Sequence, residues 1–204
     1  VLERLDERGI AGEVRHDAHL DLRVVGSEEE PALDGGIGDD TISYANARDG
    51  VAVNLLVVGP QNTLGAGTDS LLGGEHLEGS RYDDILRGNN VSNELDGGRG
   101  ADRLYSGAGS DNLTGAAGDD TLISVGQTSD VLNGGVGNDL LESDGGGNLL
   151  IGGLGVDTVS FAAVLGDSTL DLLAGQARQN AGTTVDQLFQ VQIDRAGNVA
   201  AQAH

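Results

Sequence analysis

One large aliphatic residue recurs at nine-residue intervals through the middle of the chain, with small and polar residues between. Only Ser124 breaks the nine-residue step. A unit with a single apolar position cannot enclose a core by itself, so the pattern predicts short strands stacked as a solenoid, with one side chain per unit pointing inward. The recurring residues are Leu86, Leu95, Leu104, Leu113, Leu122, Leu132, Leu141, Leu150 and Val159, with Ile42 upstream.

The complete unit reads G-G-x-G-x-D-x-U-x, where U is the aliphatic residue. Gly35–Ser43, Gly134–Glu142 and Gly152–Ser160 match it at every position. Glycine suits a tight turn with positive φ, and the residues around U suit a very short strand. We therefore predict an all-β fold, a right-handed parallel β-roll or β-solenoid with two short strands per coil and longer-coil segments as caps.

Two units per coil place every second unit in the same column, which sorts the sixth-position residues onto two edges of the roll. Asp40 stands apart upstream of both. We call the uniformly acidic column the first edge and the mixed column the second edge. The first edge holds Asp84, Asp102, Asp120, Asp139 and Asp157, and the second holds Asn93, Asp111, Asp130 and Asn148.

The charge of the chain narrows the class of partner. The sequence has 11 Lys and Arg against 33 Asp and Glu, a formal charge of -22, which argues against nucleic acid or an anionic membrane and favours cations. Carboxylates stacked about 4.8 Å apart repel each other unless a cation lies between them. The turns offer only carboxylate and carbonyl oxygens, which suit calcium better than zinc, copper or magnesium.

The array from Gly79 to Ser160 resembles the RTX, or hemolysin-type, calcium-binding repeat of proteins exported by bacterial type I secretion. This resemblance implies several calcium ions, each held between turns n and n+2 by sixth-position aspartates and glycine carbonyls. The implied ligands are Asp102, Asp120, Asp139 and Asp157, with carbonyls of Gly97, Gly98, Gly100, Gly115, Gly118, Gly134, Gly135, Gly137, Gly152, Gly153 and Gly155. Further candidates are Gly35, Gly36, Gly38 and Asp40 of the upstream copy, and Asp84, Asp111 and Asp130.

Some units depart from the family pattern. Tyr82 replaces the fourth-position glycine of the unit that contains Asp84. Val125 and Thr128 replace glycines before Asp130, so we expect fewer ions on the second edge.

The pattern divides the chain into four segments. Residues 1–33 form an N-terminal cap or the tail of a preceding domain, and residues 34–78 hold the first nonapeptide and a wider-coil segment. Residues 79–160 are the repeat array, and residues 161–204 form a C-terminal wider coil and cap. Matches at an offset of 117 residues relate the second and fourth segments, where Val51–Leu56 and Ser168–Leu173 alternate as strands and Val185–Asp194 is expected to cover the last coil.

The sequence shows no catalytic motif of the HExxH, GxSxG or phosphate-loop type, and we predict that the chain is not an enzyme. His16 and His19 would point to opposite faces of a strand, which disfavours a zinc site. The sequence shows neither an apolar membrane span nor a basic N-terminal signal peptide, so export to the medium or the cell surface would need a different export signal.

We therefore expect a structural, calcium-dependent folding module of a secreted or cell-surface bacterial protein. One alternative is the noncatalytic C-terminal module of a secreted protease, lipase or polysaccharide-modifying enzyme, joined to an upstream domain. A second alternative is a self-assembling surface or adhesive matrix component, for which late outward aliphatic residues such as Leu140 and Leu149 form a contact stripe.

Overall fold

The computed structural model describes residues 33–161 continuously, together with one strand before this range and five strands after it. Those flanking strands are Arg23–Val25, Ser168–Asp171, Gln176–Gln179, Val185–Phe189, Gln192–Ile193 and Val199–Ala200. All regular structure in the described residues is β-strand. Residues 2–8, whose sequence resembles a short helix, and the pair His16 and His19 lie outside the described residues.

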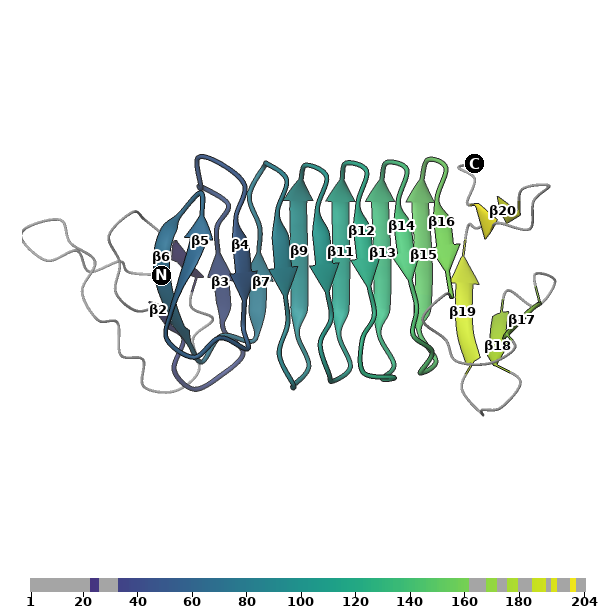
Figure 1. Cartoon of the computed structure of the whole chain (residues 1–204), viewed down its shortest axis with the longest axis horizontal. Helices are drawn as coiled ribbons and strands as arrows, with labels where there is room; N and C mark the ends of the chain where they lie inside the picture. Colours follow the sequence, from purple (N-terminus) through teal and green to yellow (C-terminus); the bar gives the residue numbers. More distant parts are fainter. Residues whose placement is uncertain are drawn as a thin grey trace, which may run out of the picture.

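Two parallel sheets face each other along the length of the molecule, and successive strands of the chain alternate between them (Figure 1). Each coil therefore contributes one strand to each sheet, as predicted for a β-roll. One sheet contains β3 (Thr41–Ser43), β7 (His76–Glu78), β9 (Glu94–Arg99), β11 (Asn112–Ala117), β13 (Val131–Val136) and β15 (Leu149–Leu154). The other contains β4 (Ala52–Asn54), β8 (Ile85–Arg87), β10 (Arg103–Tyr105), β12 (Thr121–Ile123), β14 (Leu140–Glu142) and β16 (Thr158–Ser160).

The aliphatic residues form two ladders inside the roll. Leu86 pairs in register with Leu104, and Leu104 with Leu122, each step spanning one coil of 18 residues. All eight leucines of the array are 0% exposed, which confirms the predicted inward position. Full burial of each such side chain contributes about 1.5–3 kcal/mol relative to an exposed one, so the ladders are the apolar core of this glycine-rich chain.

The irregular step of the repeat lies beside Ser124, not at it. The main-chain amides of Ser106, Ser124 and Ser143 donate equivalent hydrogen bonds to Ile123, Glu142 and Ser160, which places the three serines in one column. The extra residue therefore lies in the turn at 125–130, and the prediction that Val125 replaces the first-position glycine of this unit was wrong. A turn takes up an added residue without displacing the strands, and Gly126 (φ 99°) and Gln127 (φ 57°) adopt left-handed conformations there.

The chain leaves the stack between β4 and β7. β5 (Pro60–Leu64) and β6 (Gly67–Leu72) form an antiparallel hairpin, and β2 (Leu33–Asp34) pairs parallel to β6. Val51–Asn54 lies within the stack as predicted, whereas the following residues form this hairpin in place of a wider coil.

Additional strands continue the sheets at both ends of the roll (Figure 1). β1 (Arg23–Val25) pairs with β3 at one end. At the other end β19 (Val185–Phe189) pairs in parallel with β15. β18 (Gln176–Gln179) and β17 (Ser168–Asp171) extend that sheet, and β21 (Val199–Ala200) and β20 (Gln192–Ile193) extend the other.

Candidate metal centre

The first-edge aspartates tie successive coils together through one carboxylate oxygen each. The main-chain amide of Asp84 donates to Oδ1 of Asp102 at 2.7 Å, and that of Asp102 donates to Oδ1 of Asp120 at 2.8 Å. The same bond joins Asp120 to Asp139 and Asp139 to Asp157, each at 2.9 Å. Each of these carboxylates therefore faces the turn one coil before its own.

The second oxygen of the same carboxylates has no such partner. Oδ2 of Asp102, Asp120, Asp139 and Asp157 is buried and has no hydrogen-bond donor within reach. A buried polar atom left unsatisfied costs about 1–3 kcal/mol, and more when it is charged. Four such oxygens in one column therefore require protons or a cation.

Burial and mutual repulsion raise the proton affinity of this column. Burial, assisted by repulsion from Asp84 and Asp120, raises the pKa of Asp102 to about 8. Burial, assisted by repulsion from Asp120 and Asp157, raises the pKa of Asp139 to about 7. The pKa values of Asp120 and Asp157 are also raised, in both cases mainly by burial. The edge is thus short of positive charge.

Glycine at the first position of each unit leaves space beside the unpartnered oxygen. A Cβ atom at Gly97 would lie 2.5 Å from Oδ2 of Asp102. A Cβ atom at Gly115 would contact Oδ2 of Asp120 and would lie 2.7 Å from the carbonyl oxygen of Gly134. The corresponding carbonyl at the next level belongs to Gly152. A carboxylate oxygen and a carbonyl oxygen from the next coil therefore converge on the same space.

These donors fit a calcium ion better than a metal held mainly by side chains. Among the described residues no three acidic or histidine side chains gather into a ready-made metal cluster. A bound ion would therefore take carboxylate oxygens from the aspartate column and the rest from the glycine turns, the oxygen-only set that calcium accepts. Several of the glycines named from the sequence adopt positive φ in these turns, namely Gly98, Gly100, Gly118, Gly135, Gly137, Gly153 and Gly155.

Asp84 belongs to the first-edge column but differs in its contacts. The amide of Val51 donates to its Oδ1 at 2.7 Å, and Ser80 donates from its amide to Oδ2 and from its hydroxyl to Oδ1. Ser80 stands where the repeat has its second glycine. Both oxygens are satisfied, so this level does not show the oxygen deficit seen at Asp102.

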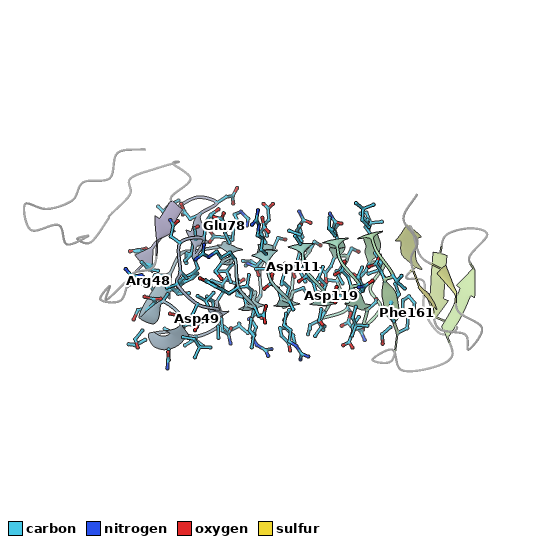
Figure 2. All side chains as sticks on the ribbon, turned by 90° about the horizontal axis from the view of Figure 1, so that it is seen from above. Arg48, Asp49, Glu78, Asp111, Asp119 and Phe161 are labelled. Carbon is cyan, nitrogen blue, oxygen red and sulfur yellow. The ribbon has the colours of Figure 1, made fainter. Side chains whose placement is uncertain are left out.

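The second edge is heterogeneous. Asp111 resembles the first edge, because its Oδ1 accepts from Asn93 at 2.7 Å, its Oδ2 is buried without a partner, and burial raises its pKa to about 7. Asp130 differs, because its Oδ1 accepts from the amide of Asp111 at 3.0 Å and its Oδ2 from the hydroxyl of Ser124 at 2.7 Å. Asp111 lies near the middle of the long axis of the roll (Figure 2).

The upstream nonapeptide meets the roll at the second edge. Its turn contains Gly35, Gly36 (φ 91°) and Gly38 (φ 144°), and the amide of Asp40 donates to the carboxylate of Glu75 at 3.0 Å. Glu75 precedes β7 as Asp40 precedes β3, so it occupies the sixth position of a unit that sequence analysis missed. The available signal was Leu77, nine residues before Leu86.

Comparison with known families identifies the repeats. Residues 71–90, 87–122 and 125–159 match the family model of the RTX calcium-binding nonapeptide repeat, in 4 copies. The matched residues span the two-strand coils and both edges described above. No curated protein matches the chain.

Proposed function

Since residues 71–122 and 125–159 of this chain match RTX calcium-binding nonapeptide repeats, we propose that the protein is a calcium-triggered folding module of an exported bacterial protein. The repeats bind several calcium ions, and the β-roll that they form is a structural fold. The proposal adds that calcium decides whether the roll is folded, and that the module acts at the cell surface or in the medium.

The observation that carries this proposal is the column of buried, unpartnered Oδ2 atoms on the first edge. The aspartates would hold calcium together with the glycine carbonyls, and the ion would supply the positive charge that this edge lacks. Without an ion, ionised carboxylates at successive levels repel one another at low local dielectric. The ion-free roll is therefore penalised at neutral pH, while the unfolded chain leaves its carboxylates in water.

Several weak sites are enough to control folding. A ligand that binds only the folded form stabilises it by RT ln(1 + [L]/Kd) per site. For Kd values of 10⁻⁴–10⁻³ M, typical of extracellular calcium modules, 1 mM calcium contributes about 0.4–1.4 kcal/mol per site. Four sites would then contribute about 2–6 kcal/mol, which is comparable to the whole stability of a small domain.

The composition supports the same switch. A formal charge of -22 on 204 residues with 2% aromatic content disfavours a compact state when no cation is bound. A chain that stays unfolded at the low calcium concentration inside a cell and folds at millimolar calcium outside is suited to export. The described residues contain no helix long and apolar enough to cross a membrane.

Circular dichroism during a calcium titration tests the proposal. We expect a disordered spectrum in excess chelator at pH 7.5 and a cooperative change to a β spectrum as calcium rises to millimolar levels. Magnesium at the same concentration is the control, because it demands tight octahedral geometry and should not produce the change. A β spectrum that persists unchanged in excess chelator would refute the switch.

A further inference from the structure

The second edge has its own means of joining neighbouring turns at Asn148. This side chain is 0% exposed, and its Nδ2 lies 2.9 Å from the hydroxyl of Ser124, 2.9 Å from that of Ser143 and 2.7 Å from the carbonyl of Gly145. Its Oδ1 accepts from the amide of Asp130 at 2.8 Å. Three oxygen atoms from two successive turns therefore converge on one nitrogen.

An amide nitrogen in this position does electrostatically what a cation would do. Its two N–H bonds carry partial positive charge toward the surrounding oxygens, whereas the first edge directs only oxygens into the equivalent space. At Asp139 the sixth-position side chain presents a bare Oδ2, with Gly134 at the first position of its unit. At Asn148 the first-position residue is Ser143, whose side chain fills part of that space.

The neighbouring levels of the second edge are closed by similar bonds. The Ser124 hydroxyl donates to Oδ2 of Asp130 at 2.7 Å and lies 3.2 Å from Oδ1 of Asp144, so it links two turns. Nδ2 of Asn93 donates to the main-chain carbonyl of Glu75 at 2.7 Å. Among the described residues of this edge from Asn93 to Asn148, only Asp111 keeps a buried carboxylate oxygen without a hydrogen-bond partner.

We propose that Ser124, Ser143 and Asn148 form a built-in substitute for calcium, a hydrogen-bonded clasp that joins successive turns of the second edge and takes no ion. The inference rests on the proposed calcium-dependent folding and adds an asymmetry to it. Ions hold the first edge in register, while side-chain amides and hydroxyls hold most of the second. The sequence signature of an ion-free turn is then a unit with serine at its first position and asparagine at its sixth.

Calcium stoichiometry of matched variants tests the clasp. Asn148→Ala and Asp139→Ala remove the sixth-position side chain from opposite edges of neighbouring units. At saturating calcium, Asp139→Ala should bind at least one ion fewer than the wild type by isothermal titration calorimetry. Asn148→Ala should bind the same number, with a folded-to-unfolded ratio about tenfold lower at a fixed calcium concentration, because buried oxygens lose their donor. Loss of an ion in Asn148→Ala would make Asn148 a ligand and overturn the inference.

Two further measurements decide the question if Asn148→Ala does not fold. Ser143→Ala removes one contact of the clasp and should keep the wild-type ion count. A crystal of the wild type grown in calcium should show anomalous scattering peaks beside Asp102, Asp120 and Asp139, and none within 3 Å of the Asn148 side chain, a limit that exceeds calcium–oxygen bond lengths of about 2.3–2.6 Å. A peak at Asn148 overturns this inference alone, whereas absence of all peaks would count against the proposed function itself.

Discussion

The main-chain amide of Asp120 donates to Oδ1 of Asp139 at 2.9 Å, while Oδ2 of the same Asp139 side chain is buried without a partner. One carboxylate therefore has two roles in the stack. Its first oxygen aligns adjacent coils, and its second oxygen creates the need for a cation. The two roles can be separated by mutation, because asparagine retains an acceptor oxygen but removes the charge.

Asp120→Asn and Asp120→Ala should have different effects. The asparagine variant retains an acceptor for the amide of Asp102 but loses a carboxylate ligand, so it should bind fewer calcium ions than the wild type. In chelator its folded state should be more stable than that of the wild type, because the repelling charge is gone. The alanine variant also leaves that buried amide without an acceptor, which costs about 1–3 kcal/mol more. Urea unfolding in calcium, together with the residual β spectrum in chelator measured by circular dichroism, measures both effects. The control is Glu94→Gln, which removes one negative charge from an exposed side chain, as Asp120→Asn does from a buried one. If Glu94→Gln lost as many calcium ions as Asp120→Asn, that result would contradict a specific role for Asp120.

Protonation of the first-edge aspartates at acid pH should stabilise the roll when calcium is absent. The pKa of Asp102 is raised from 3.8 to about 8 and that of Asp139 from 3.8 to about 7 in the ion-free roll. Because these acids hold protons in the folded state that the unfolded chain releases, their contribution to stability is fully present below pH 4 and is lost as the pH rises through 7 to 8. In chelator, the unfolding free energy should therefore fall steadily between pH 4 and pH 8.

The folded fraction in chelator across this pH range, measured by circular dichroism, checks the sign. Asp102→Asn removes one of the titrating groups and should flatten the dependence. With calcium present the trend should reverse, because protons compete with the ion for the same oxygens. Stability in chelator that rises with pH would contradict the predicted charge deficit of the first edge.

Ala116 offers a stabilising change. It has φ 73°, the left-handed conformation, and pairs in register with Gly98 and Gly135 of the adjacent coils. An L-residue pays about 1–2 kcal/mol for this conformation, while glycine adds about 0.4–1 kcal/mol of unfolded-state entropy. Ala116→Gly should therefore gain about 0.5–1 kcal/mol and lower the calcium concentration at half folding. Ala117→Gly, at the next and exposed position, should lose stability instead, and equal effects of the two variants would argue against backbone strain at Ala116.

The leucine ladder should be sensitive to truncation. Leu113 is 0% exposed and lies in register between Leu95 and Leu132, so Leu113→Ala leaves a cavity between adjacent coils. The expected loss is about 2–5 kcal/mol, measured by urea unfolding in saturating calcium. Leu154→Ala, at a side chain that is 50% exposed, should cost much less, and similar losses at both positions would show that the ladder is not the main core.

The sequence alone determined the repeating framework of this protein. The nine-residue period placed each leucine inside the roll and each first-edge aspartate in one column, because a step of 18 residues per coil, or 19 where the turn at 125–130 is longer, carries every position onto its equivalent in the next coil. The donor chemistry of the turns also pointed to calcium. These features depend only on residue type and spacing, which are visible without coordinates.

The tertiary structure alone decided what happens where the spacing is interrupted and how each carboxylate is used. The hairpin between β4 and β7 interrupts the nine-residue count, so only the structure places Asp40 on the second edge beside Glu75, and the longer turn at 125–130 leaves Ser124 in the serine column. Aspartates that are identical in the sequence differ in their contacts: Oδ2 of Asp130 is bonded to Ser124, and Oδ2 of Asp120 is unpartnered. Hydrogen bonding at each level depends on neighbours 18 or 19 residues away, and only the stacked coils bring those neighbours within bonding distance.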